Sequence, residues 1–212
     1  MVTAKDMEPL WVFINKCCLD QGIDESHGLK HSKGCVEWVN KLLSEEVDVS
    51  DEERKVAIYA AALHDMCDKK YTDVGTGLIT IRQWLLSQGW SLALSDVLIN
   101  IVNSTSYSKL KRAMVNGRIV FPDHGPFNRV YHIVRHADLL DAYRVGRCFL
   151  YQQHVSPNIL DEECWAIVRA LFNVRVFPYV SDGWITIPAA VRYAKELEAV
   201  ALKCFETRTF EY

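Results

Sequence analysis

The stretch Val56-Ala-Ile-Tyr-Ala-Ala-Ala-Leu-His64-Asp65 decides the fold, because it is apolar on nearly every side before it ends on a histidine and an aspartate. A helix that is apolar nearly all round belongs in the centre of a protein. The preceding Ser50-Asp-Glu-Glu53 is typical of a capping box, in which Ser50 and Glu53 satisfy each other's backbone N–H groups. We therefore expect a central helix that begins after Ser50 and ends at His64 and Asp65.

Outward from this helix, seven further segments carry apolar residues at helical spacing. We expect these helices over residues 6–19, 26–46, 78–88, 91–102, 127–153, 161–172 and 188–205. The expected connections include a turn at 71–77, a hydroxyl-rich loop at 103–108, and a loop or short extended piece at 174–187. The sequence has no alternating strands joined by hairpin turns and no internal repeat. The predicted class is all-α, with residues 1–212 forming a single-domain helical bundle.

Composition and charge exclude several classes of function. The formal net charge of the 212 residues is −3, so no overall basic field favours nucleic acid or an anionic membrane surface as partner. The seven cysteines include no Cys-x-x-Cys pair, which argues for reduced thiols rather than a disulfide framework. The N-terminus carries charge where a signal peptide would be apolar, and no apolar run is long enough to span a bilayer. We expect a cytoplasmic protein without a membrane partner.

Four polar residues are the candidate metal ligands: His31, His64, Asp65 and Asp138. His64 and Asp65 close a very apolar helix, and Asp138 lies inside another apolar segment. Buried histidines and aspartates need partners, and a metal ion is one such partner. Two imidazoles and two carboxylates suit one divalent ion, with Mn, Fe, Co, Ni, Mg and Zn as the options. Adjacent residues can bind one ion only where a helix ends or distorts, so we expect the helix to end at this pair.

Asp68 is the candidate catalytic residue, because it lies one turn beyond Asp65. A metal-bound water has a lowered pKa and becomes a nucleophile near neutral pH. Asp68 could accept a proton from that water or hold it by a hydrogen bond.

Candidate substrate-binding residues surround the same stretch. Lys69 and Lys70 follow at once and would meet negative oxygens on a substrate. His27 lies one helical turn before His31 and could donate to phosphate. Lys109, after the hydroxyl-rich segment, is a further phosphate candidate. Together they make hydrolysis of a phosphoester or phosphoanhydride the predicted chemistry.

Simpler assignments exist for several of these residues. A single histidine is more often a surface or satisfied core residue than a ligand, and Asp138 could pair with Arg135 three residues before it. Arg144 and Arg147 are expected to pair with nearby acids such as Asp141. The combined placement of the histidines and aspartates, rather than any one of them, favours a metal site.

The motifs resemble the HD-domain superfamily of metal-dependent phosphohydrolases, in particular its small stand-alone bacterial-type members. In that family a histidine, a His-Asp pair and a distant aspartate lie on a helical bundle. The resemblance spans about residues 24–153. It is carried by Ser26-His-Gly-Leu-Lys-His31, His64-Asp-Met-Cys-Asp-Lys-Lys70, Ser104-Thr-Ser-Tyr-Ser108 and His136-Ala-Asp-Leu-Leu-Asp141 continuing to Arg147.

The resemblance implies an enzyme with one divalent metal, a metal-bound water as nucleophile and a phosphorylated small molecule, often a nucleotide, as substrate. It also implies that Asp68 activates or orients the water and that Lys70 contacts the phosphate. One departure is His136, which stands where such relatives often have aspartate. Residues 157–212 lie outside the motifs and are expected to complete the bundle; they could also cover the site or form a homodimer surface.

Two other functions remain as alternatives. The first is a catalytically silent HD domain that binds a nucleotide or a protein partner. The second is an HD-type oxygenase with two irons, which would need additional histidine ligands between Asp65 and Asp138. His132 and His136 are four residues apart, but we expect them to serve ordinary packing.

Overall fold

The computed structural model describes residues 4–210, and within them the chain is all-α, as the sequence predicts. One isolated antiparallel bridge, between Val115 and Arg118, is the only β-pairing in this range. The α-helices are α1 (Ala4–Gln21), α2 (Leu29–Ser44), α3 (Asp51–Leu63), α4 (Val74–Ser87), α5 (Leu92–Ser104), α6 (Tyr107–Arg112), α7 (Asn128–Asp141), α8 (Val145–Val155), α9 (Asp161–Leu171) and α10 (Pro188–Thr207). Short helical turns occupy Gly125–Phe127, Phe172–Val176 and Phe177–Tyr179.

Helix α3 lies at the centre of the fold. All its residues from Val56 to Leu63 are buried, and it packs against α2, α5 and α7. The predicted capping box is confirmed, since the Glu53 backbone N–H donates to Ser50 Oγ and the Ser50 backbone N–H donates to the Glu53 carboxylate. Burying a large apolar side chain contributes about 1.5–3 kcal/mol, so the apolar surface of α3 anchors its C-terminal end firmly.

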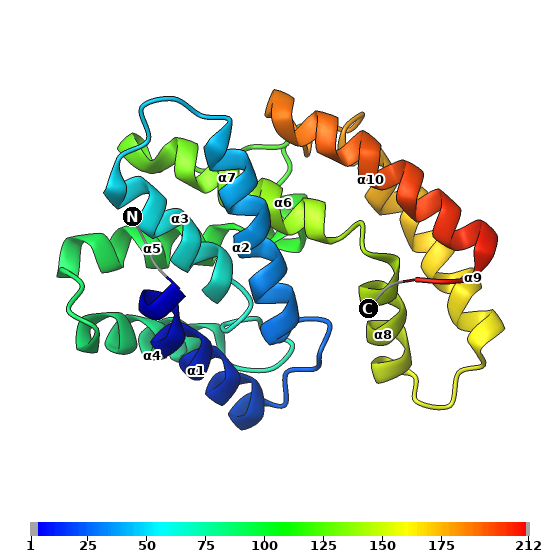
Figure 1. The fold of residues 1–212 in the computed structure, drawn as a ribbon, viewed down its shortest axis with the longest axis horizontal. Coiled ribbons are helices and arrows are strands. Elements are labelled where there is room, and N and C mark those ends of the chain that lie inside the picture. The colour runs from blue at the N-terminus through cyan, green and yellow to red at the C-terminus, as the bar shows by residue number, and fades with distance from the viewer. Residues whose placement is uncertain (1–3, 211–212) are drawn as a thin grey trace.

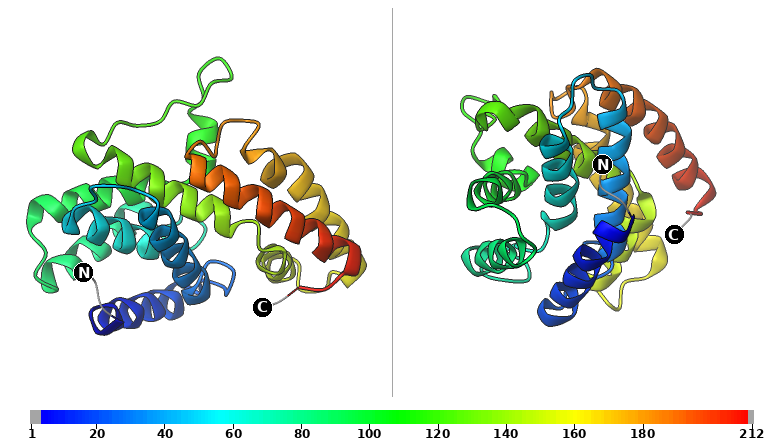
Figure 2. Two further views of the ribbon diagram at one scale, coloured as in Figure 1. Left: turned by 45° about the horizontal axis from the view of Figure 1, so that its top comes forward. Right: turned by 60° about the vertical axis from the view of Figure 1, so that its left-hand side comes forward.

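The helices form two groups on either side of α7. Helices α1 to α5 gather on one side, and α9 and α10 lie together on the other, with α8 beside α9 (Figure 1). The two further views show the same division (Figure 2). Buried apolar side chains still form one contiguous cluster that runs from Met7 to Ala201. None of the described helices has the length and apolarity needed to cross a bilayer.

The predicted single helix over 127–153 is wrong, because the chain breaks between Asp141 and Val145 to give α7 and α8. Arg144 leaves the helical region with φ −70° and ψ 101°. Its side chain pairs with Asp141 at 2.8 Å, and the Gly146 position packs against Phe210 so closely that a Cβ would lie 2.7 Å from the ring. The first contact is local and was expected, whereas the packing of Gly146 against Phe210 is a tertiary contact that an apolar periodicity does not reveal. The break turns α8 toward the end of α3.

The predicted loop at 103–108 is also mostly helical. Helix α5 continues to Ser104, and α6 begins at Tyr107. Ser104 and Thr105 donate their hydroxyls to carbonyls of the preceding turn, which lets hydroxyl-bearing residues stay in helical geometry. As a result Lys109 lies on a short helix rather than on a loop.

The predicted turn at 71–77 is shorter than expected, because α4 already starts at Val74 after an Asp73 cap. Gly77 is therefore helical, and it allows α4 to approach the His64–Lys70 segment. A Cβ at Gly77 would lie 2.7 Å from the Cβ of Cys67.

The first residues of segment 174–187 form helical turns, whereas a loop or short extended piece was expected. After α9 the chain makes a five-residue π-helical turn over Phe172–Val176 and then a short 3₁₀ turn over Phe177–Tyr179. Such π turns inside helices are rare and are often found at functional sites. This one places Arg175 toward the end of α3.

Candidate metal centre

The four predicted ligands come from three helices and meet at one point. His31 lies on α2, Asp138 on α7, and His64 and Asp65 follow directly after α3. The Nε2 atom of His31 lies 3.3 Å from His64 Nε2 and 3.3 Å from Asp65 Oδ2. Asp138 Oδ1 lies 3.6 Å from His31 Nε2 and 3.5 Å from His64 Nε2. Ligands at roughly 2.0–2.2 Å from one ion are themselves about 3–3.5 Å apart, so this spacing fits one ion.

Neighbouring residues His64 and Asp65 can both face this point because α3 ends at Leu63. Tighter turns follow, with the Met66 backbone N–H donating to Leu63 O at 3.0 Å and that of Asp68 to Asp65 O at 3.1 Å. The expectation that the helix ends at the pair is confirmed.

Hydrogen bonds to the other ring nitrogens fix both histidines. His31 Nδ1 lies 2.6 Å from Asp141 Oδ2, and His64 Nδ1 lies 2.8 Å from Ala61 O. A carboxylate and a carbonyl can only accept, so each Nδ1 carries the hydrogen. A proton on Nδ1 leaves Nε2 of each ring as the atom that faces the common point, and in the neutral form this is the tautomer that metal-binding histidines adopt. Asp141 thus orients a ligand, a role the sequence did not assign to it.

The charges around this point are compatible with a bound cation. Asp65 Oδ2 is buried and has no hydrogen-bond partner. Burial disfavours the imidazolium of His64, but the carboxylates of Asp65 and Asp138 outweigh it and raise its pKa to about 10. Without a metal ion the site would thus hold a proton, whereas a divalent ion would satisfy the lone pairs and the orphaned oxygen together.

Cys35 forms a second possible donor set, with one atom each from His31, Cys35, His64 and Asp138 within 4.8 Å of one another. This buried group could hold a metal ion. Sequence reasoning missed Cys35, although it lies four residues after His31 and therefore on the same helix face. Burial and nearby carboxylates raise the pKa of the Cys35 thiol well above its usual value, which disfavours the thiolate that a metal binds. Asp65, whose Oδ2 is buried without a hydrogen-bond partner, is the alternative fourth donor.

The sequence predicted Arg147 only as a partner of nearby acids such as Asp141, but the structure also places it beside the candidate ligands. It comes from α8, and its guanidinium lies 4.0 Å from Asp65 and 4.0 Å from Asp138. The expected pairing with Asp141 also forms, at 3.7 Å. Its Nη2 donates to His31 Nε2 at 3.2 Å, consistent with a lone pair on that atom. The break after α7 makes these contacts possible, and the only glycine near it in the sequence is Gly146, which lies in the first turn of α8.

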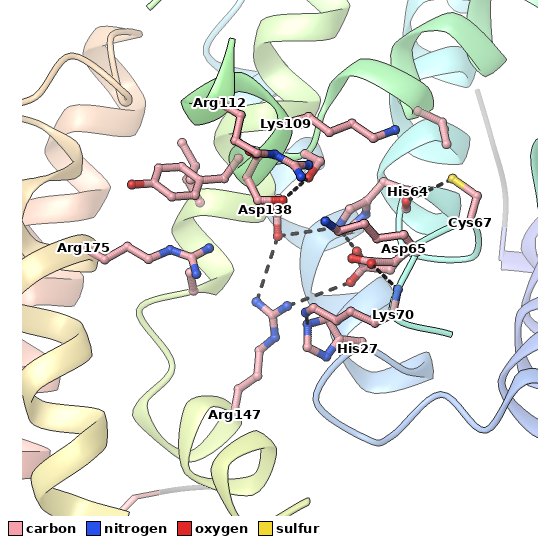
Figure 3. Close-up of a pocket in the computed structure, with 18 of the residues that line it drawn as sticks. His27, His64, Asp65, Cys67, Lys70, Lys109, Arg112, Asp138, Arg147 and Arg175 are labelled. Carbon is pink, nitrogen blue, oxygen red and sulfur yellow. Dashed lines mark hydrogen bonds and ion pairs between the residues drawn. The ribbon is translucent and has the colours of Figure 1, made fainter. Parts of the chain in front are cut away.

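The donor cluster opens into a chamber of about 180 Å³. Cationic side chains reach the chamber from different sides of Asp65 and Asp138 (Figure 3). The described cations that line it are Lys69, Lys70, Lys109, Arg112, Arg147 and Arg175. Carboxylates lie at its floor and cations around its walls, which is the charge distribution expected for a metal-assisted reaction on an anionic substrate.

The predicted residues Asp68, Lys70 and His27 all line this chamber. One Asp68 oxygen accepts the Lys70 backbone N–H at 2.9 Å, so its carboxylate is held in place. Lys70 Nζ lies 3.0 Å from His27 Nε2 and can only donate, so this His27 nitrogen acts as an acceptor. Burial lowers the pKa of His27, in keeping with a neutral ring. In this arrangement His27 Nε2 orients Lys70, and both side chains line the chamber.

Lys109 and Lys69 also line the chamber. Lys109 Nζ donates to Asn103 Oδ1 at 2.8 Å and to Asn103 O at 3.0 Å, which ties it to the end of α5. Lys69 is exposed at the rim. Arg112, one turn after Lys109, and Arg175 from the π turn were not among the candidate residues. Arg112 belongs to the basic run Lys109-Leu-Lys-Arg112, whereas no local sequence pattern singles out Arg175.

Two other suggestions from the sequence are resolved by the contacts. Arg135 does not pair with Asp138; it is buried, donates to Trp184 O and lies over the Phe121 ring. His136 accepts the Thr186 backbone N–H at 2.8 Å through Nε2 and so serves packing, as expected.

Comparisons with known proteins bear on the fold alone. No protein-family model and no curated protein matches the chain. Among solved structures, it is similar to a crystal structure of a structural-genomics target from Lactobacillus plantarum, with a TM-score of 0.68 and 17% identity. The match covers 98% of this chain and 96% of that chain. The arrangement of helices is therefore shared over nearly the whole length of both proteins.

Proposed function

We propose that this chain is a metal-dependent phosphohydrolase of the HD-domain superfamily that acts on a nucleotide or a similar phosphorylated small molecule. One observation carries the proposal. Two imidazole lone pairs and two carboxylates lie 3.3–3.6 Å apart at the floor of a chamber whose walls carry cations.

His31, His64, Asp65 and Asp138 would hold one divalent ion, with Mn, Fe, Co, Ni, Mg and Zn all compatible with the nitrogen and oxygen donors. When bound, the ion would lower the pKa of a water molecule and draw charge from a phosphoryl oxygen.

The chain's own residues would perform the remaining work of hydrolysis. Asp68 accepts a proton as a water oxygen bonds to phosphorus and the bond from phosphorus to the leaving oxygen breaks. Lys70, held by His27, and Arg147 compensate the negative charge of the phosphoryl oxygens. The leaving oxygen departs with the rest of the substrate and takes a proton from solvent.

The direct test is turnover by purified protein loaded in turn with Mn, Fe(II), Co, Ni, Mg and Zn. A panel of nucleoside mono-, di- and triphosphates is supplied, and released phosphate and pyrophosphate are measured separately. We expect hydrolysis with at least one metal. Asp68→Asn should lower kcat by about 10²–10⁴-fold, the usual contribution of a general base, while the metal stays bound.

Asp182→Asn is a matched control, because Asp182 lies in an exposed turn and does not line the chamber. It should behave as wild type. If metal-loaded wild-type protein binds nucleotides but turns over none of them, the enzyme proposal is wrong and the silent binding domain takes its place.

A further inference from the structure

A second cavity of about 280 Å³ adjoins the metal chamber. Its outer walls come from α8, α9 and the π turn that follows α9, all of which lie beyond α7 in the chain (Figure 1). The two cavities are adjacent, because they share six lining residues: His27, Lys70, Ala142, Arg147, Arg175 and Tyr179.

The second cavity differs in chemistry from the first. Apart from the shared residues, its lining is mostly apolar or aromatic and holds no carboxylate. These residues are Ser26, Cys148, Tyr151, Gln152, Ile167, Val168, Leu171 and Val176. An apolar pocket with a few polar groups is typical of a site for an organic ring system.

Two fixed guanidinium groups mark the border between the cavities (Figure 3). Arg147 donates through Nε to Ser26 O and pairs with Asp141. Arg175 donates through Nε to Tyr179 OH at 3.0 Å, and its guanidinium lies 4.4 Å from the centre of the Tyr107 ring. Guanidinium groups bind phosphate oxygens and also stack on aromatic faces, so they suit the junction between a phosphate chain and a ring.

The π turn provides a second, independent observation. Phe172 and Val176 of this turn are buried. The turn places Arg175 where it lines both cavities and Val176 where it lines the second cavity. Because π turns interrupt regular helical hydrogen bonding, they are seldom kept without a role and recur at functional sites.

We propose that the second cavity binds the nucleobase of a nucleotide substrate whose phosphates lie in the metal chamber. This inference rests on the proposed function and assigns it a substrate with an uncharged heteroaromatic ring. Tyr151 already carries Lys70 Nζ over its ring, 4.8 Å from the ring centre, and the rest of its aromatic surface lines the cavity together with Ile167 and Leu171. The Gln152 amide can both donate and accept at the edge of the base. The α8–α9 segment, which contains none of the metal ligands, thereby sets substrate selectivity.

The test compares ATP with inorganic tripolyphosphate, which has the same phosphate chain without a nucleoside. Dissociation constants are measured by calorimetry with manganese in the Asp68→Asn background, so that binding is recorded whether or not the wild type is a hydrolase. Base stacking contributes roughly 1–3 kcal/mol, so ATP should bind about 5–150-fold more tightly than tripolyphosphate.

Ile167→Trp adds bulk at the rim of the cavity, where Ile167 is 45% exposed and the fold has room. It should reduce the preference for ATP over tripolyphosphate at least fivefold. Val200→Trp is the matched control, because Val200 lies on α10, is 59% exposed and lines neither cavity. It should keep the wild-type preference.

The inference is overturned if wild-type protein binds ATP and tripolyphosphate equally, or if Ile167→Trp keeps the full preference. A preference for ATP that Ile167→Trp abolishes, in a protein with no turnover, would support the base pocket and reject hydrolysis. The two failures are therefore distinguishable.

Discussion

The two cavities of this molecule adjoin but are built in opposite ways. The metal chamber takes its candidate ligands from α2, the end of α3 and α7, and its floor consists of buried charged and polar groups that include an unpartnered Asp65 oxygen. The second cavity takes its outer walls from α8, α9 and a π turn, and its lining is largely apolar. The first is specified by a few polar residues, whereas the second is specified by how helices pack.

This difference separates two functions that one site must combine. A buried cluster of histidines and carboxylates tolerates little change, because removing one member leaves the others unpaired in a low-dielectric interior. An apolar pocket tolerates changes of size and shape at a cost of about 1–3 kcal/mol per change. We therefore expect substitutions in the metal chamber to abolish function and those in the second cavity to alter selectivity.

The largest effect on metal affinity among variants that spare the ligands is expected for Asp141→Asn. Asp141 is nearly fully buried and holds His31 Nδ1 at 2.6 Å. Its carboxylate is stabilised despite burial, because His31 lowers the pKa of Asp141 to about 2. Loss of such an orienting partner typically costs 10–100-fold in metal affinity, and calorimetric titration with zinc measures it. Asp96→Asn, which breaks an exposed pair with Arg82, is the control and should change affinity little.

Arg175→Ala tests the border between the cavities. A hydrogen bond to a charged group contributes about 1.5–3 kcal/mol, so nucleotide KM should rise roughly 10–150-fold. Metal content should remain that of wild type, since Arg175 is not a ligand. Arg169→Ala is the comparison, because Arg169 belongs to α9 and lies over Phe205 outside both cavities. An equal rise in KM for both variants would mean that Arg175 acts only through packing.

Metal affinity should rise with pH. The pKa of His64 is raised to about 10 when no metal is present, so near neutral pH a proton occupies the ring and must leave before a metal binds. Each pH unit between 6 and 8 should then increase the apparent affinity by up to about tenfold. Competition titrations with a chelator of known pH dependence measure this slope. A flat profile would show that the site binds no proton in competition with metal.

The smallest effect is expected for Cys35→Ser, which decides between the two donor sets. Cys35 Sγ lies 3.6 Å from the His31 ring nitrogens, but its thiol is disfavoured as a thiolate. If Asp65 is the fourth ligand, zinc affinity should change by no more than about threefold, as for a small buried residue outside the coordination sphere. A loss of zinc affinity as large as that caused by removing a ligand would assign Cys35, and not Asp65, as the fourth ligand.

The sequence predicted the metal chamber better than its surroundings. Local sequence patterns that can be interpreted without knowing the fold contain the four candidate ligands: His31, His64, Asp65 and Asp138. The burial of α3 followed from its apolar residues, and its beginning followed from Ser50 and Glu53. No similar local pattern predicts the break after Asp141, because the apolar spacing of that stretch is that of a continuous helix.

Arg175 and the π turn illustrate what local patterns omit. Phe172 and Val176 of this turn are buried, and the Phe172 ring contacts Phe205 of α10. Pro178, two residues beyond Val176, signals a helix end but does not specify a π turn. Arg147 was correctly paired with Asp141, but its approach to Asp65 depends on where α8 points. The residues missed were those placed by tertiary packing, and these also line the second cavity.

Metal content per chain tests the central claim most directly. Wild-type protein, Asp65→Ala, His64→Ala and Asp68→Asn are each loaded with zinc or manganese, dialysed and analysed by mass spectrometry, with circular dichroism confirming that each is folded. We predict close to one ion per chain for the wild type and Asp68→Asn, and close to none for Asp65→Ala and His64→Ala. Folded Asp65→Ala and His64→Ala proteins that retain a full ion would contradict the account.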